Sequence, residues 1–272
     1  MCRLFGMSAG AESVKATFWL LDAPDSLAAQ SHQNADGTGI GFFDAGGVPH
    51  IDKQPIAAFE DRSFATEARE IRSRTFVSHV RHATTGGLTV ANTHPFCLNQ
   101  RLFAHNGVIG DMPKLERELG AYRDLLKGET DSERYFALIT REVDRHGGDV
   151  GAGIRTAVRW VVANLQIRSI NFVLITDREL WALRYPETHT LFALERPAGG
   201  SQEVPDVALE QTSSHGTRVR SEDGRNRATA IIASERMDAD RGWRELASGE
   251  LIHIDAGLTL TSDQPLGPEP TR

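Results

Sequence analysis

Residues Cys2–Ala9 read CRLFGMSA, which places a cysteine one residue from the start of the chain. The segment Arg3–Ala9 has the length and composition of a β-strand, so the thiol stands where a strand begins. Methionine aminopeptidase generally removes Met1 when a small residue follows it, and cysteine is small enough. We therefore expect a mature chain in which Cys2 carries both a thiol and a free α-amine.

Such a residue can act as a nucleophile without a separate base. An α-amine has an ordinary pKa of ~7.7–8.0, so a large fraction of it is neutral at cellular pH. The neutral amine can accept the thiol proton, directly or through a water, in place of the histidine of a Cys–His pair. Taken alone, however, a cysteine at position 2 is more often a buried strand residue.

The composition is that of a soluble globular protein, with 40% hydrophobic and 25% charged residues among 272. The net charge of −7 argues against broad nucleic-acid binding. We find no membrane span, no signal peptide and no phosphate-binding loop motif, which predicts a cytoplasmic protein without membrane or nucleic-acid partners. The two cysteines, Cys2 and Cys97, are expected to be reduced and cannot form a four-cysteine zinc site.

Strand patterns dominate both ends of the chain, and helix patterns lie between them. The clearest helix spans Asp131–His146, and a second spans Ile154–Leu165. Two strand-rich halves with intervening helices predict stacked sheets with helices packed outside. We expect a single domain over residues 1–262, followed by a loose tail at 263–272.

His105-Asn106-Gly107 follows a strand predicted at Arg101–His105. The amide of Asn106 and the backbone N–H of Gly107 could together hold the oxyanion of a tetrahedral intermediate. The alternative is a type I′ hairpin turn, for which Asn-Gly is the strongest short signal.

Arg81 and Thr84 follow the strand predicted at Thr75–His82, beside a glycine-rich loop. An arginine there can bind a carboxylate in a bidentate manner, although a surface salt bridge is its commoner role. Asp131 begins the long helix, where it could cap the helix or hold a substrate ammonium. Arg81 and Asp131 together would define a pocket for an amino acid.

Four histidines raise the alternative of a metal hydrolase, namely His79, His82, His94 and His105. No HExxH pattern occurs, and His79 and His82 would lie on opposite faces of a strand. Structural histidines are the better interpretation, and we expect neither a metal nor another cofactor.

Six motifs follow one another as in the class II glutamine amidotransferases, and the resemblance spans roughly residues 2–135. They are Cys2-Arg3-Leu4-Phe5-Gly6, Asp36-Gly37-Thr38-Gly39-Ile40-Gly41, His79-Val80-Arg81-His82-Ala83-Thr84, Asn92-Thr93-His94-Pro95-Phe96, His105-Asn106-Gly107 and Thr130-Asp131-Ser132-Glu133. Later residues, from Ile232 to Asp238 and from Trp243 to Ile252, resemble the stand-alone branch of this family. That branch includes the YafJ-like proteins and the ergothioneine-pathway γ-glutamyl hydrolases.

The resemblance implies an α+β fold, a four-layer αββα N-terminal-nucleophile hydrolase sandwich with two mainly antiparallel sheets. It implies that Cys2 is the nucleophile and that Asn106 and Gly107 form the oxyanion hole. It assigns substrate binding to four residues: Arg81 and Thr84 for an α-carboxylate, Asp131 for an α-ammonium, and His105. It covers Ser234-Glu235 without assigning this pair a catalytic role. A turn contact at the end of a strand is at least as good an interpretation of the pair as a role in catalysis.

The expected reaction is hydrolysis of glutamine or a γ-glutamyl conjugate through a thioester on Cys2, releasing glutamate and ammonia or an amine. No later motif matches a synthase domain, so a separate synthase subunit is the alternative partner that would use the ammonia. A non-catalytic sensor of glutamine or γ-glutamyl compounds is the other alternative. Cys2 and Asn106 argue against a sensor, because a pure binder needs neither.

Overall fold

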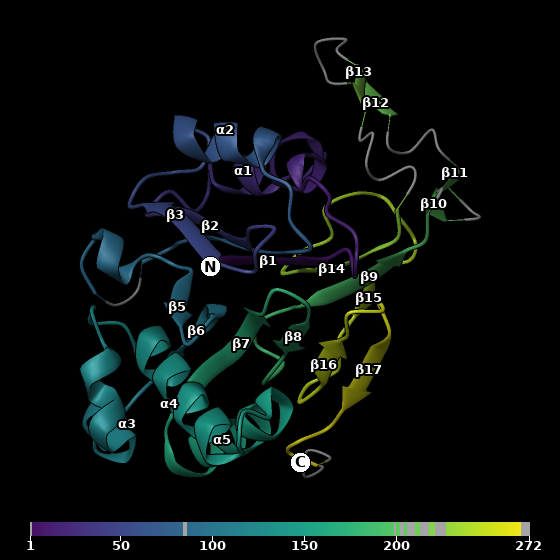
Figure 1. The fold of residues 1–272 in the computed structure, drawn as a ribbon. Helices are drawn as coiled ribbons and strands as arrows, with labels where there is room; N and C mark the ends of the chain where they lie inside the picture. The colour runs from purple at the N-terminus through teal and green to yellow at the C-terminus, as the bar shows by residue number, and fades with distance from the viewer. Residues whose placement is uncertain are drawn as a thin grey trace.

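The computed structural model describes residues 2–83, 86–198 and 227–267, and the backbone of short strands at 200–201, 204–205, 210–212 and 218–220. Two antiparallel sheets lie face to face, with helices on both outer faces (Figure 1). The short strands β10 (Gly200–Ser201), β11 (Val204–Pro205), β12 (Glu210–Thr212) and β13 (Arg218–Arg220) form two separate pairs.

The first sheet contains the N-terminal strand in its interior. Its order is β15 (Arg244–Glu245), β9 (Phe192–Arg196), β14 (Thr229–Ala233), β1 (Arg3–Ser8), β4 (Thr75–Val80), β2 (Thr38–Phe43) and β3 (Pro49–Gln54). Its outer face is covered by η1 (Phe18–Asp22), α1 (Leu27–Gln30) and α2 (Arg62–Glu70).

The second sheet has the order β17 (Leu260–Asp263), β16 (Leu251–Ile254), β8 (Leu180–Leu183), β7 (Ile167–Ile175), β6 (Arg101–Ile109) and β5 (Phe96–Leu98). Its outer face is covered by α3 (Met112–Leu119), η3 (Gly120–Leu125), α4 (Asp131–Arg145) and α5 (Val150–Asn164). A short η2 (Val90–Asn92) precedes β5. Within the described chain, no helix is long and apolar enough to cross a membrane.

Three clusters of buried hydrophobic side chains pack the layers against one another. One lies under α2 and η1, one lies under α4 and α5, and the third fills the space between the sheets. The third includes Leu4 of β1, Val77 of β4 and Ala104 of β6. These layers confirm the predicted αββα sandwich.

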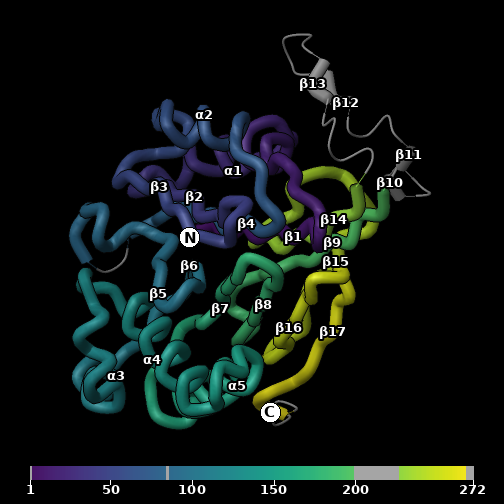
Figure 2. The backbone as a smooth tube through the Cα atoms, viewed as in Figure 1, coloured from purple at the N-terminus to yellow at the C-terminus, as the bar shows by residue number. Residues whose placement is uncertain are grey.

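The alternation of side chains along a strand decides which residues reach the gap between the sheets. Successive side chains point to opposite faces, so residues two apart share a face. Leu4, Val77 and Ala104 face the gap, which directs Cys2, Arg81 and Asn106 toward it as well. Strands β1, β4 and β6 come together there although they are distant in sequence (Figure 2).

Two local predictions are corrected by the structure. Strand β6 does not end at His105 but continues through Asn106-Gly107 to Ile109, because β7 pairs along this whole length. Asn106-Gly107 is therefore not a hairpin turn. Asp131 is not the cap of α4, since the hydroxyl of Thr130 takes that place by accepting a hydrogen bond from Glu133 N at 3.2 Å.

The start of the predicted tail is held against the second sheet. Asp263 is the last residue of β17 and pairs with Arg155 of α5 at 2.6 Å. The carbonyl of Pro265 accepts a hydrogen bond from Arg159 Nε at 2.7 Å. Residues 268–272 lie outside the described part of the chain.

Candidate active site

Cys2 lies directly before β1, and its thiol meets the backbone of His82. His82 N lies 3.2 Å from Cys2 Sγ, and the thiol in turn lies 3.3 Å from the His82 carbonyl. Burial raises the pKa of the Cys2 thiol, and the hydrogen bond from the His82 backbone opposes this only in part. The thiol therefore rests in its protonated form, and a reaction through its sulfur requires a base.

Asn106 reaches Cys2 from the opposite sheet. Its side-chain Nδ2 donates a hydrogen bond to the Cys2 carbonyl at 3.0 Å. Asn106 is buried, and the hydroxyl of Ser169 on β7 donates to its backbone carbonyl at 3.1 Å. The carboxamide is thus fixed beside the residue that carries the thiol, with the two sheets each supplying one partner.

Gly107 occupies a position that no larger residue fits. A Cβ atom on Gly107 would lie 1.8 Å from the backbone oxygen of Ser169 and 2.7 Å from His105 Nε2. The close approach of β6 to β7 at this point therefore depends on glycine.

We expect Gly107→Ala to lower the free energy of unfolding by about 3 kcal/mol or more, since backbone atoms of β7 would have to move. Urea unfolding monitored by circular dichroism measures the change. Gly46→Ala is the control, because a Cβ there would meet only the Asp44 carboxylate, at 3.2 Å. Equal unfolding midpoints for the two variants would contradict the packing argument.

Arg81 is buried and directly follows β4. Its guanidinium donates to the carbonyls of Gly87 and Gly86 at 3.1 and 3.3 Å. Its positive charge is one of the influences that lower the pKa of the Cys2 thiol, which sets it near the sulfur. Thr84, predicted to act with it, lies outside the described residues.

Asp131 lies in the first turn of α4, next to the end of β6. Its Oδ2 accepts a hydrogen bond from Ile109 N at 2.8 Å, and the side chain is buried. Its negative charge raises the pKa of the Cys2 thiol. The structure therefore brings Asp131 to the same end of the gap as Cys2 and Arg81.

His105 lies on the other face of β6 from Asn106. Its Nδ1 is 2.9 Å from the hydroxyl of Ser132, and its ring packs edge-on against Tyr135 of α4. Burial lowers the pKa of His105, so the ring is neutral near pH 7. Because the strand alternates, His105 points away from Cys2, but it lies close enough to Asp131 for that negative charge to oppose the lowering of its pKa by burial.

The remaining histidines of the predicted cluster separate into two environments. His79 and His94 are fully buried with ring centroids 4.2 Å apart, and burial lowers the pKa of His79 to about 3. The His82 side chain is half exposed. Among the described residues, no group of three or more His, Cys, Asp or Glu side chains is arranged to hold a metal ion.

Two residues to which the sequence motifs gave no role connect the parts of this site. Asn92 joins the Arg81 loop to the segment before α4, because it donates to the Gly87 carbonyl at 3.2 Å and accepts from Glu129 N at 2.8 Å. His189 forms a hydrogen bond with the Asn106 carbonyl, although burial and the charge of Arg168 lower its pKa. Asn92 was visible in a motif, whereas no local pattern marks His189.

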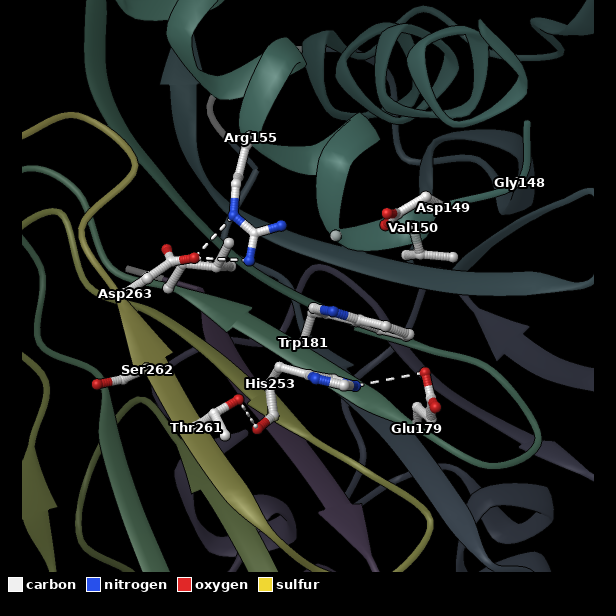
Figure 3. Close-up of a pocket in the computed structure, with 12 residues that line it drawn as sticks. Gly148, Asp149, Val150, Arg155, Glu179, Trp181, His253, Thr261, Ser262 and Asp263 are labelled. Carbon is white, nitrogen blue, oxygen red and sulfur yellow. Dashed lines mark hydrogen bonds and ion pairs between the residues drawn. The ribbon is translucent and has the colours of Figure 1, made fainter. Parts of the chain in front are cut away.

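Two of the cavities among the described residues lie away from Cys2. One, of about 550 Å³, lies between the start of α5 and strands β8, β16 and β17, where Trp181 stacks on His253 (Figure 3). The other, of about 570 Å³, is lined by residues of β3 and β5, including Lys53 and Cys97. None of the predicted site residues lines either cavity.

Comparison with proteins of known sequence points to one family. The chain is 28% identical over 280 residues to the gamma-glutamyl-hercynylcysteine sulfoxide hydrolase of Mycobacterium tuberculosis strain H37Rv, which covers 98% of this chain and 100% of that protein. It is 24% identical over 258 residues to the putative glutamine amidotransferase YafJ of Escherichia coli K12, covering 92% and 96%.

Solved structures share the fold. The glutamine phosphoribosylpyrophosphate amidotransferase of B. subtilis superposes with a TM-score of 0.67 at 18% identity, over 98% of this chain. Our chain spans 50% of the length of that enzyme. A predicted glutamine amidotransferase from Pseudomonas aeruginosa PA01 superposes with a TM-score of 0.61 at 20% identity, over 94% of this chain and 98% of its own.

The family model described as glutamine amidotransferases class-II matches residues 1–270. This match covers almost the whole chain, and the chain shares its sandwich fold with the related structures described above. The protein belongs to the class II glutamine amidotransferase family.

Proposed function

We propose that this protein hydrolyses a γ-glutamyl amide bond through a thioester on Cys2. The observation that carries the proposal is the meeting of Cys2 and Asn106 across the gap between the sheets, with Asn106 Nδ2 3.0 Å from the Cys2 carbonyl. A thiol and a fixed amide donor from opposite sheets are the two parts that acyl transfer requires.

The first half of the reaction forms the thioester. In the mature chain the α-amine of Cys2 accepts the thiol proton, which is needed because burial raises the pKa of the thiol. The sulfur attacks the amide carbon, and the negative charge on the former carbonyl oxygen is stabilised by Asn106 Nδ2 and by Gly107 N–H. The ammonium formed on Cys2 then protonates the leaving nitrogen, and the carbon–nitrogen bond breaks.

The second half releases glutamate. The neutral amine of Cys2 takes a proton from a water, which attacks the thioester carbon at the site the leaving amine has vacated. A second tetrahedral intermediate uses the same donors, because its oxygen occupies the same position. Its collapse expels the sulfur, which regains its proton from the amine.

Arg81 and Asp131 are suited to hold the glutamyl group. The guanidinium of Arg81 lies near Cys2 and donates to the carbonyls of Gly86 and Gly87, and a carboxylate is a stronger partner for a guanidinium than a neutral carbonyl. Thr84 would add a hydroxyl to the α-carboxylate. Asp131 uses Oδ2 to bind Ile109 N, which leaves Oδ1 to accept from an α-ammonium. We propose that His105 supports this pocket from behind β6 through its contact with Ser132.

The similarity to the mycobacterial hydrolase favours a γ-glutamyl conjugate over glutamine as the substrate. That similarity extends over 100% of the relative and 98% of this chain. We therefore propose that the leaving group is an amine larger than ammonia and that water is the acceptor.

The test is glutamate release by the processed enzyme from a panel of amides. It includes L-glutamine, several γ-glutamyl dipeptides and the matching α-glutamyl dipeptides. We expect release from γ-glutamyl dipeptides to exceed release from glutamine, and none from α-glutamyl dipeptides, which cannot present both α-groups to Arg81 and Asp131. Equal hydrolysis of α- and γ-linked dipeptides would refute the proposed pocket.

A further inference from the structure

The start of β1 is paired regularly on only one side. Toward β4, the register continues to Arg3 opposite Val80. Toward β14, the register begins only at Phe5, opposite Ala233. Arg3 and Leu4 therefore lie beyond the end of the β14 ladder, and they are the residues that connect Cys2 to the sheet.

Ser234, the residue after β14, completes the missing pairing at Leu4. Its backbone N donates to the Leu4 carbonyl at 3.0 Å, and its hydroxyl oxygen accepts from Leu4 N at 2.9 Å. One buried residue thus satisfies both backbone groups of Leu4, with a side-chain oxygen in place of a strand carbonyl. Thr190 in turn fixes Ser234 by donating to its carbonyl at 2.8 Å.

Glu235 makes the corresponding contact with Arg3. Its Oε1 lies 2.7 Å from Arg3 NH2, and the Arg3 side chain is largely buried whereas Glu235 is 44% exposed. Asp25 lies near both, since Glu235 raises and Arg3 lowers the pKa of the Asp25 carboxyl, although burial is the largest influence. Two consecutive residues, Ser234 and Glu235, therefore hold two consecutive residues of β1.

The segment that carries Ser234 and Glu235 is itself anchored. Arg196 of β9 lies 3.1 Å from Asp238 Oδ2 and 3.0 Å from Asp240 Oδ2, and all three side chains are buried. Trp243 Nε1 donates to Asp238 Oδ1 at 2.7 Å. A buried ionic group with several hydrogen bonds is costly to break, so it fixes the position of the chain just after Glu235.

We propose that Ser234 and Glu235 are positioning residues that align the mature N-terminus for catalysis. Residues at a chain terminus tend to fray, yet this mechanism requires the amine and thiol of the first residue to keep a defined geometry. A displacement of 1 Å at a reacting group can lower a rate by about 10²-fold. The inference rests on the proposed use of Cys2 as an N-terminal nucleophile.

Ser234→Ala and Glu235→Gln, made in the processed enzyme, test this role. We expect kcat to fall about 10- to 100-fold while KM stays within about twofold, because Arg81 and Asp131 still hold the glutamyl group. Glu235→Asp retains the carboxylate, and we expect it to recover most of kcat. Asp263→Asn is the matched control, since it breaks an ion pair with Arg155 in the other sheet layer and should leave kcat unchanged.

A second measurement keeps the proposal separate from the identity of the substrate. In a Cys97→Ala background, the rate of Cys2 alkylation by iodoacetamide reports how well the amine deprotonates the thiol. We expect this rate to fall about tenfold in the Ser234→Ala and Glu235→Gln variants. If Ser234→Ala fails to fold, Glu235→Gln still tests the positioning role, because Glu235 is partly exposed and its replacement should leave the fold intact.

Folded variants with wild-type kcat and wild-type alkylation rates would exclude a positioning role. A rise in KM with unchanged kcat would instead place Ser234 and Glu235 in substrate binding. If the wild-type enzyme hydrolyses no γ-glutamyl amide, the proposed function fails, while the alkylation rates still decide whether Ser234 and Glu235 position Cys2.

Discussion

We expect replacement of Cys2 by alanine to abolish γ-glutamyl amide hydrolysis, lowering kcat by about 10⁴-fold or more. The thioester cannot form without the sulfur, and the structure offers no second thiol near Asn106, since Cys97 lies on β5 and is exposed. Glutamate release measures the loss. The fold should persist, because the thiol contacts only the His82 backbone among the contacts resolved.

Two controls make the Cys2→Ala result specific. Cys97→Ala removes the other thiol and should leave kcat unchanged. Isothermal titration of Cys2→Ala with a γ-glutamyl dipeptide should give a Kd close to the wild-type KM, since Arg81 and Asp131 remain. Substantial turnover by Cys2→Ala would remove Cys2 as the nucleophile, and loss of activity in both cysteine variants would point to a general effect of thiol removal.

Local sequence patterns were sufficient to predict the layers of the fold. Helical spacing in Asp131–His146 and strand composition in Arg3–Ala9 correspond to α4 and β1, because both elements bury the faces that their patterns mark. The Asn106-Gly107 pair shows the limit of a local signal. Its preference for a turn is overridden by pairing of β6 with β7 from Leu102 to Ile109, which is a tertiary effect.

Strand alternation explains why one motif divides between two environments. His105, Asn106 and Gly107 are consecutive, so a motif treats them as a unit. In the structure Asn106 faces Cys2, whereas His105 faces α4 and binds Ser132. The sequence could predict that these two side chains diverge, but it could not predict which of them faces Cys2 without knowing which face of β6 meets the first sheet.

Contacts between distant segments were not predictable from the sequence. Ser234 reaches Leu4 across 230 positions, and Asn106 reaches Cys2 across 104. Such contacts depend on sheet order and register, which no spacing rule along one chain provides. The resemblance to a family supplied the candidate residues of the site, whereas the residues that we propose to position Cys2 emerged only from the arrangement of β1 and β14.

Extension of the N-terminus should inactivate the enzyme reversibly. With a tag fused directly to Cys2, the thiol remains but its amine becomes an amide, which cannot act as a base. We expect kcat to fall about 10²- to 10⁴-fold, the range that general-base catalysis contributes. Removal of the tag by a protease that cleaves immediately before Cys2 should restore activity in the same sample, as followed by glutamate release and mass spectrometry.

This experiment separates the amine from the thiol, which Cys2→Ala cannot do. A tagged Cys2→Ala protein is the control, since cleavage should produce no activity from it. A C-terminally tagged enzyme should be fully active once Met1 is removed, because three strands separate β17, the last strand described, from β6, which carries Asn106. Full activity in a protein whose N-terminal tag is shown by mass spectrometry to be uncleaved would show that another group deprotonates the Cys2 thiol. His189, with its hydrogen bond to the Asn106 carbonyl, would then be the first residue to replace.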